Sequence, residues 1–98
     1  MHVLTVCYHQ PEDASSFDEY YRTTHEPLAR KVLGLQTFTA RRCASLDESP
    51  PPYYFVAELA FESQQALDAA LSSAEGQTAA GDIANFASGG VTMFVQHD

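Results

Sequence analysis

Three segments of this chain have the composition of β-strands, and each carries apolar side chains in both of its alternating positions. They are His2–Tyr8, Tyr53–Phe61 and Val91–Gln96. Successive side chains of a strand point to opposite faces, so a sheet built from these segments is apolar on both faces. The first segment places Leu4, Val6 and Tyr8 on one face and Val3, Thr5 and Cys7 on the other. The second segment places Tyr53, Phe55, Ala57 and Leu59 on one face and Tyr54, Val56 and Ala60 on the other. This two-sidedness limits the folds that the chain can adopt.

The first helix is predicted to begin at Ser16, because Ser16 and Glu19 form the capping-box pattern of a helix N-terminus. Residues at spacings of three and four then form one apolar stripe. These are Phe17, Tyr21, Thr24, Leu28 and Val32. Pro27 interrupts the stripe and either kinks the helix or starts a second short one, and Gly34 is a plausible stop.

The remaining elements are predicted with less regular patterns. Leu35–Cys43 is a second strand, and the proline-rich stretch Ser45–Pro52 is a loop. A second helix begins at Ser63 and buries Leu67, Ala70, Leu71 and Ala74. Residues 76–90 are expected to be irregular, with one short turn capped by Asp82 and carrying Ile83 and Phe86.

The element order β-α-β-β-α-β predicts an α+β domain with a ferredoxin-like, four-stranded antiparallel sheet. Two helices can cover only one face of such a sheet. Leaving several apolar side chains of the other face in water forgoes roughly 1.5–3 kcal/mol each. The simplest cover is a second copy of the chain, so a homodimer is expected. The alternative is that the strand registers differ and the extra apolar residues are scattered on the surface.

Length and charge narrow the classes of partner. The 98 residues fit a single domain, 1–98, without an apolar run for a membrane span or a signal peptide, and a cytoplasmic location is expected. Five Lys and Arg against 13 Asp and Glu give a net charge of −8, which disfavours nucleic acid and anionic membranes. The two cysteines are expected to be reduced, although parity allows a disulfide, and the four histidines lack metal-site spacing.

Two stretches resemble the signature segments of one known family. Residues 17–34, FDEYYRTTHEPLARKVLG, are similar to the first-helix motif of the EthD-like proteins, an aromatic pair followed by His-x-Pro-Leu-Ala. Residues 73–90, SAEGQTAAGDIANFASGG, are similar to the second signature, with Asp-x-x-Asn-Phe after a glycine-containing loop. Leu33 departs from the family, which often has proline there.

The resemblance implies a dimeric α/β barrel, in which two ferredoxin-like sheets pack together between subunits. It also implies a range of cofactor-free chemistries, because relatives in polyketide pathways act as decarboxylases or dehydratases and similar barrels host isomerases, cyclases and monooxygenases. A fold alone does not choose among these activities.

His25 is the first candidate for a catalytic acid or base, because an imidazole can move protons near neutral pH. It is expected at the flank of the apolar stripe, one turn after Tyr21, with a backbone carbonyl freed by Pro27 to orient it. The alternative is a structural histidine that stabilises the kinked helix. Tyr8, expected at a pocket mouth, and Tyr21 are the candidate hydrogen-bonding partners in catalysis.

Five further residues are predicted to bind substrate. Tyr20 and Tyr54 offer hydroxyls, and Asp82 and Asn85 offer polar groups from the family-like segment, although Asp82 also fits a helix cap. Phe86 fits a hydrophobic anchor for that segment.

The first functional hypothesis is an enzyme without metal or organic cofactor that performs proton transfer on a hydrophobic carbonyl compound, by isomerisation, cyclisation, dehydration or decarboxylation. The second is a non-catalytic binding or accessory protein for an apolar metabolite. A third is a dimerisation module, which predicts no ligand-sized cavity.

Overall fold

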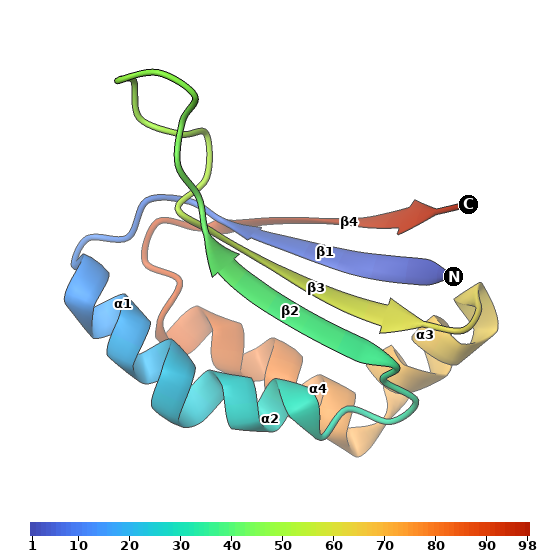
Figure 1. Ribbon diagram of the computed structural model, residues 1–98. Coiled ribbons are helices and arrows are strands. Elements are labelled where there is room, and N and C mark those ends of the chain that lie inside the picture. Colours follow the sequence, from blue (N-terminus) through green and yellow to red (C-terminus); the bar gives the residue numbers. More distant parts are fainter.

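The computed structural model describes residues 1–98 and contains one four-stranded antiparallel sheet (Figure 1). Its strands are β1 (His2–Tyr8), β2 (Thr37–Arg42), β3 (Phe55–Phe61) and β4 (Val91–His97), in the spatial order β2-β3-β1-β4. β1 is central and pairs with both β3 and β4. The predicted ferredoxin-like arrangement is therefore confirmed, with β2 and β3 slightly shorter than the sequence suggested.

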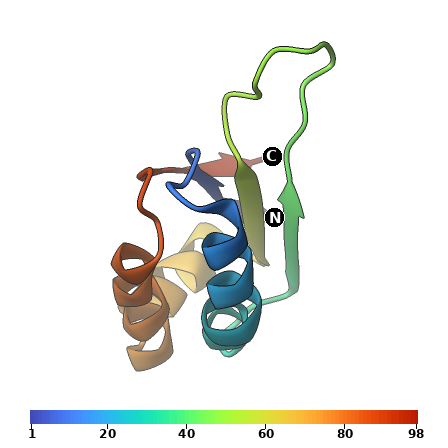
Figure 2. The same cartoon turned by 90° about the vertical axis from the view of Figure 1, so that its left-hand side faces the viewer.

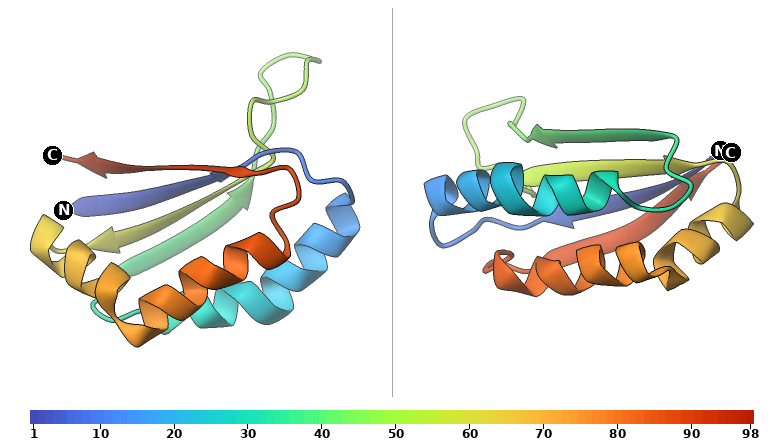
Figure 3. Two further views of the ribbon diagram at one scale, coloured as in Figure 1. Left: turned by 180° about the vertical axis from the view of Figure 1, so that it is seen from behind. Right: turned by 90° about the horizontal axis from the view of Figure 1, so that it is seen from below.

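All helices lie on one face of the sheet, in two rods (Figures 2 and 3). The first rod is α1 (Ala14–Tyr20), a π-helical turn η1 (Tyr21–His25) and α2 (Glu26–Arg30). The second rod is α3 (Gln64–Ser72), α4 (Ala74–Asp82) and a 3₁₀ turn η2 (Ile83–Asn85). α2 packs against α4, which holds the two rods together. None of these helices is both long enough and apolar enough to cross a membrane.

The first helix begins earlier than predicted. Asp13 is its N-cap, and the Asp13 carboxylate accepts a hydrogen bond from the Ser16 backbone N–H at 3.0 Å. Ser16, predicted to be the capping residue, lies inside the first turn and is exposed. Asp and Ser are equally good N-cap residues. Asp13 has this role because its backbone is still extended, as an N-cap requires, whereas Ser16 is already helical.

Residues 76–90 are more regular than predicted, because α4 occupies the first part of this stretch. Ser73 caps α4 by accepting a hydrogen bond from the Gly76 N–H at 3.0 Å. Gly76 does not break the helix; it lets α4 pass close to the Ala70 backbone carbonyl of α3. The chain then leaves through Gly90 at φ 91°, a conformation that favours glycine.

The two faces of the sheet differ in what covers them. The helix-side face meets an aromatic core formed by Tyr8, Phe17, Tyr21, Phe55 and Phe86. The other face has no helix, and at its centre Gln96 donates hydrogen bonds to Thr5 at 2.7 Å and Glu58 at 2.8 Å. Around these polar groups lie the apolar side chains Val3, Cys7, Val56, Ala60 and Phe94. Phe94 is 46% exposed.

Three predicted side-chain positions are wrong. Tyr54 was placed on the face of Val56, but β3 starts only at Phe55 and the Tyr54 ring lies 5.4 Å from that of Phe17 on the helix side. Leu71 and Ala74 were expected to be buried and are exposed, because the helical rod breaks at Ser73 between α3 and α4.

Cys7 and Cys43 are both free thiols, as expected from the sequence.

The two glycines inside α4 provide a test of this packing. Gly76→Ala is expected to lower the free energy of unfolding by about 1–3 kcal/mol, because the added methyl group meets the Ala70 carbonyl. Gly81→Ala is the matched control in the same helix, where nothing lies within 4 Å, and is expected to raise stability by about 0.5–1 kcal/mol. Urea unfolding of both variants measures the difference; equal effects would contradict the close approach.

Candidate active site

Pro27 determines how the first rod presents its side chains. Proline has no N–H and cannot make the α-helical hydrogen bond to the carbonyl four residues earlier. Immediately before it the helix widens into the π turn η1, where the Glu26 N–H donates to the Tyr21 carbonyl five residues back. The rod continues through this bulge into α2. Both predicted alternatives for Pro27, a kink or a new short helix, thus resolve into one rod with a wider turn.

The bulge moves His25 into the interior. The stripe that points to the sheet consists of Phe17, Tyr21, His25, Ala29 and Val32, all of them buried. Thr24, predicted to lie in this stripe, is exposed. The extra residue of the π turn shifts the helix phase by one position, so His25 takes the place expected for Thr24 and is only 4% exposed.

A carboxylate from the second rod holds the His25 imidazole. Asp82, at the end of α4, lies with its Oδ2 2.9 Å from His25 Nδ1. The other oxygen, Oδ1, accepts hydrogen bonds from the Tyr20 hydroxyl at 2.6 Å and the Asn85 amide at 3.0 Å. Residues 57 positions apart in the chain are thereby joined by a buried hydrogen bond.

This arrangement fixes the protonation state of both groups. Burial lowers the pKa of the His25 imidazole, although the hydrogen bond and charge of Asp82 act in the opposite direction. Burial alone would raise the pKa of the Asp82 carboxyl, but the hydrogen bonds from Tyr20, Asn85 and His25 outweigh it and lower that pKa. At neutral pH the pair is therefore a neutral imidazole beside a carboxylate. Because a carboxylate only accepts, Nδ1 carries the proton and Nε2 is left with a free lone pair.

Aromatic rings restrict the orientation of the imidazole. The Phe86 ring lies 4.7 Å from that of His25, and the Tyr21 ring lies 5.2 Å away. Phe86 also stacks on Tyr20 at 5.3 Å. His25 is thus packed from two sides while Asp82 holds Nδ1, which leaves Nε2 as the nitrogen free to meet a ligand.

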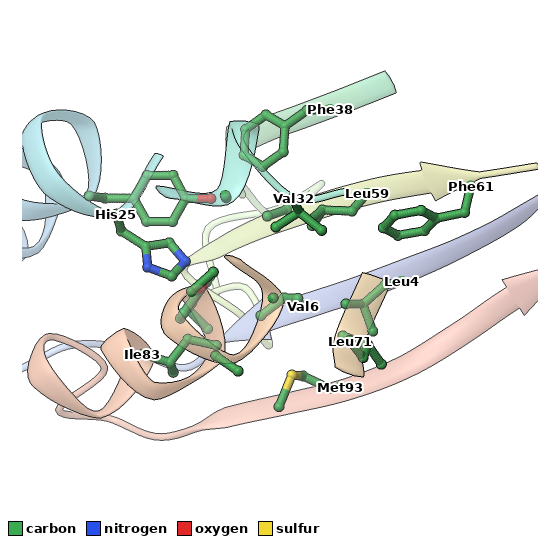
Figure 4. Close-up of a pocket in the computed structure, with 17 residues that line it drawn as sticks. Leu4, Val6, His25, Val32, Phe38, Leu59, Phe61, Leu71, Ile83 and Met93 are labelled. Atoms are coloured by element: carbon green, nitrogen blue, oxygen red, sulfur yellow. The ribbon is translucent and has the colours of Figure 1, made fainter. Parts of the chain in front are cut away.

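His25 lines an apolar cavity of about 70 Å³ between the helices and the sheet (Figure 4). Of the residues around it, only His25 and Gly76 are not hydrophobic. The others are Leu4, Val6, Tyr8, Tyr21, Ala29, Val32, Phe38, Ala57, Leu59, Phe61, Leu71, Ala79, Ala80, Ile83 and Met93. The cavity therefore offers one base in surroundings that suit an uncharged ligand.

Tyr8 and Tyr21 bring the other polar atoms to the cavity wall. Both side chains are buried, and both belong to the lining of the cavity. Burial raises the pKa of Tyr8, with smaller contributions from Tyr21 and Asp82, and burial also raises the pKa of Tyr21. Both hydroxyls therefore stay protonated and are available as donors to an oxygen of a ligand.

The EthD domain family model matches residues 9–90, which is most of the chain and includes every residue of the His25–Asp82 network. The chain belongs to the EthD family. The resemblance of residues 17–34 and 73–90 to the two family segments is thereby confirmed.

Individual relatives agree with this assignment. An uncharacterized 11.0 kDa protein of Rhodococcus erythropolis is 47% identical over 93 residues, which cover 95% of this chain and 90% of the relative. The crystal structure of an EthD family protein from Bacillus halodurans superposes with a TM-score of 0.94 at 31% identity, covering 100% and 98% of the two chains. A structure from Jannaschia, described as a dimeric ferredoxin-like protein of unknown function, has a TM-score of 0.70 at 19% identity and full coverage of both chains.

The predicted site residues lie in three different places in the EthD domain. His25, Tyr8 and Tyr21 line the cavity. Behind the imidazole, away from the cavity lining, lie Tyr20, Asp82, Asn85 and Phe86. Tyr54 lies apart from both groups, and its hydroxyl donates to the Asp18 carboxylate at 2.7 Å.

Three expectations about these residues are corrected. Asp82 does not cap η2 with its side chain, because both of its carboxylate oxygens are taken by Tyr20, Asn85 and His25. The group that orients His25 is accordingly this carboxylate and not a backbone carbonyl freed by Pro27. Tyr8 does not stand at a mouth; it is 1% exposed in the aromatic core.

Sequence reasoning missed the aliphatic side of this EthD site. Ile83, Met93 and Leu71 line the cavity, but from sequence they look like ordinary core or surface residues. The alternation of β4 predicts that Val91, Met93 and Val95 share one face, but it does not indicate that this face meets a cavity. No group of three or more His, Cys, Asp or Glu side chains lies close enough together to hold a metal ion.

The His25–Asp82 pair predicts an unusual titration. In ¹⁵N-detected NMR, His25 is expected to remain neutral with its proton on Nδ1 and to titrate below the ordinary histidine value of about 6.5, because burial lowers its pKa. Asp82→Asn is expected to lower the pKa of His25 further, since it removes the charge that favours the imidazolium. A pKa above 6.5, or a rise in Asp82→Asn, would contradict this electrostatic account.

Proposed function

We propose that this EthD domain is a cofactor-independent enzyme that uses His25 to remove a proton from a carbon next to a carbonyl group of an uncharged, apolar compound. The observation that supports it is the buried His25–Asp82 hydrogen bond of 2.9 Å, which leaves Nε2 free beside the cavity. A histidine base with an oriented ring and a partner carboxylate is a common means of proton abstraction.

The steps follow from the groups that line the cavity. Nε2 takes the proton from the carbon, and the carbon–hydrogen electron pair moves into an enolate whose oxygen carries the negative charge. The Tyr8 and Tyr21 hydroxyls are the donors available to stabilise that oxygen. The imidazolium is stabilised by Asp82, 2.9 Å from Nδ1, until it returns the proton to carbon or to a leaving oxygen.

This chemistry favours some of the four reaction types that the sequence analysis considered. Isomerisation, cyclisation and dehydration each begin with an enolate and need no group beyond those described. Decarboxylation is less well supported, because its substrate carries a carboxylate into a cavity that contains no cationic side chain. A ketone, ester or lactone fits the site better than an acid.

A second candidate function is the binding of an apolar metabolite without turnover. It is favoured by the lining itself, in which 15 of 17 residues are hydrophobic and His25 carries the only imidazole. A purely structural dimerisation module has less support, because it does not require a cavity beside a buried histidine.

We also propose that the protein is a homodimer in which the helix-free faces of two sheets pack together. Phe94, on the edge strand β4, is 46% exposed on that face, and Val3 of β1 and Val56 of β3 lie on the same face. The Jannaschia protein, described as dimeric, has the same fold and supports this arrangement. A two-fold interface would bring each apolar face against its own copy.

Proton abstraction is tested by deuterium exchange. In D₂O, the protein is expected to catalyse exchange of the α-protons of small ketones and lactones, followed by ¹H NMR. His25→Ala is expected to lower the rate by about 10²–10⁴-fold, the usual contribution of a general base. His9→Gln, a histidine outside the cavity, is the control and is expected to exchange at the unchanged rate. Saturable binding with no exchange would favour the binding protein instead.

The dimer is tested by light scattering at micromolar concentration. The protein is expected at twice the mass of one chain, and Phe94→Asp is expected to run as a monomer, because it places a charge within the shared face. Leu33→Asp, at a 59% exposed position outside the sheet, is the matched control and is expected to remain a dimer. A wild-type protein of single-chain mass would exclude the shared face.

A further inference from the structure

The cavity has a polar end and an apolar end. His25, Tyr8 and Tyr21 supply its polar atoms, and all three are buried. The lining farther from His25 is entirely hydrocarbon and thioether, with Met93 from β4 and Leu71 from α3 (Figure 4). A ligand that places a carbonyl at His25 therefore directs the rest of its structure toward Met93 and Leu71.

The apolar end is the open one. Met93 is 51% exposed and Leu71 is 42% exposed, although both line the cavity and both are large apolar side chains. Met93 faces the helix side at the sheet edge, in register with Val6 of β1. Val95, two residues along the same face of β4, continues this apolar surface past Leu4. The apolar lining of the cavity thus reaches the molecular surface at Met93 of β4 and Leu71 of α3.

The cavity alone is small. Its volume is about 70 Å³, less than half that of the apolar cavities of about 150 Å³ that hold a benzene molecule, so it accommodates the reacting carbonyl and little more. A substrate of any greater size must extend past Met93 and Leu71. The exposed side chains there can bury only hydrocarbon, because the lining at that end has no polar atom apart from the backbone.

We propose that the natural ligand is an uncharged carbonyl compound with a hydrocarbon tail, and that Met93 and Leu71 bind the tail where it leaves the cavity between α3 and β4. This inference rests on the proposed function for the position of the carbonyl head beside His25. Met93 suits a tail site, since its unbranched thioether side chain adapts to chains of different shape. The two residues determine which tail lengths the site accepts.

The test measures the binding of alkan-2-ones, from butan-2-one to nonan-2-one, by NMR titration. The full-length protein is used in whichever oligomeric state it adopts in solution. Affinity is expected to rise about fourfold for each added methylene that becomes buried. Met93→Asp and Leu71→Asp are each expected to weaken nonan-2-one binding at least tenfold and butan-2-one binding less than twofold. Leu33→Asp, at a 59% exposed position outside the cavity lining, is the control and is expected to change neither.

Two outcomes overturn the tail site. One is an affinity that does not depend on chain length, and the other is an equal loss for short and long ketones in Met93→Asp and Leu71→Asp. His25→Gln separates this proposal from the catalytic one. It is expected to keep the chain-length dependence of binding and to lose deuterium exchange. Wild-type protein that shows length-dependent binding without any exchange would remove the proposed chemistry and leave the tail site in place.

Discussion

The hydrogen bond between His25 and Asp82 is the interaction on which the site depends. An ionised carboxylate that is 8% exposed is costly unless its oxygens are satisfied, and Asp82 has three donors, from His25, Tyr20 and Asn85. The same bond joins the two helical rods across the space beneath the sheet. The fold and the proposed chemistry are therefore coupled, because rods that moved apart would lose both the packing and the orientation of the His25 imidazole.

The side of His25 that meets the cavity is determined by a local feature of the chain. Pro27 removes one backbone donor, and the π turn before it rotates the following side chains by one position. Without that extra residue, Thr24 would face the sheet and His25 would lie at the flank, as the regular spacing predicted. The wider turn before Pro27 thus places the His25 imidazole within the buried face of the helix and not at its edge.

The sequence allowed prediction of those features that depend on local patterns. The alternation of β1 assigned Leu4 and Val6 to one face and Val3 to the other, as the strand pairing shows. The partner of Asp82 could not be predicted in this way, because it lies 57 residues away and is reached only after the rods pack. Nor could the continuous α4 be predicted, since its two glycines weaken the helical pattern while the Ser73 cap and close packing stabilise it.

The burial that keeps the His25 imidazole neutral also makes the stability of the fold sensitive to acid. The pKa of His25 is lowered in the folded state, so the folded state binds fewer protons than the unfolded chain as pH falls below about 6.5. Stability is therefore full above that pH and decreases from there down to the folded pKa. The lowered pKa of Asp82 adds a second loss only below about 3.9, where the unfolded carboxyl begins to be protonated. A neutral, buried imidazole at position 25 thus lowers the stability of the fold in mild acid. An apolar residue at the same position would fill the space without this pH dependence. Packing alone therefore does not explain a histidine there.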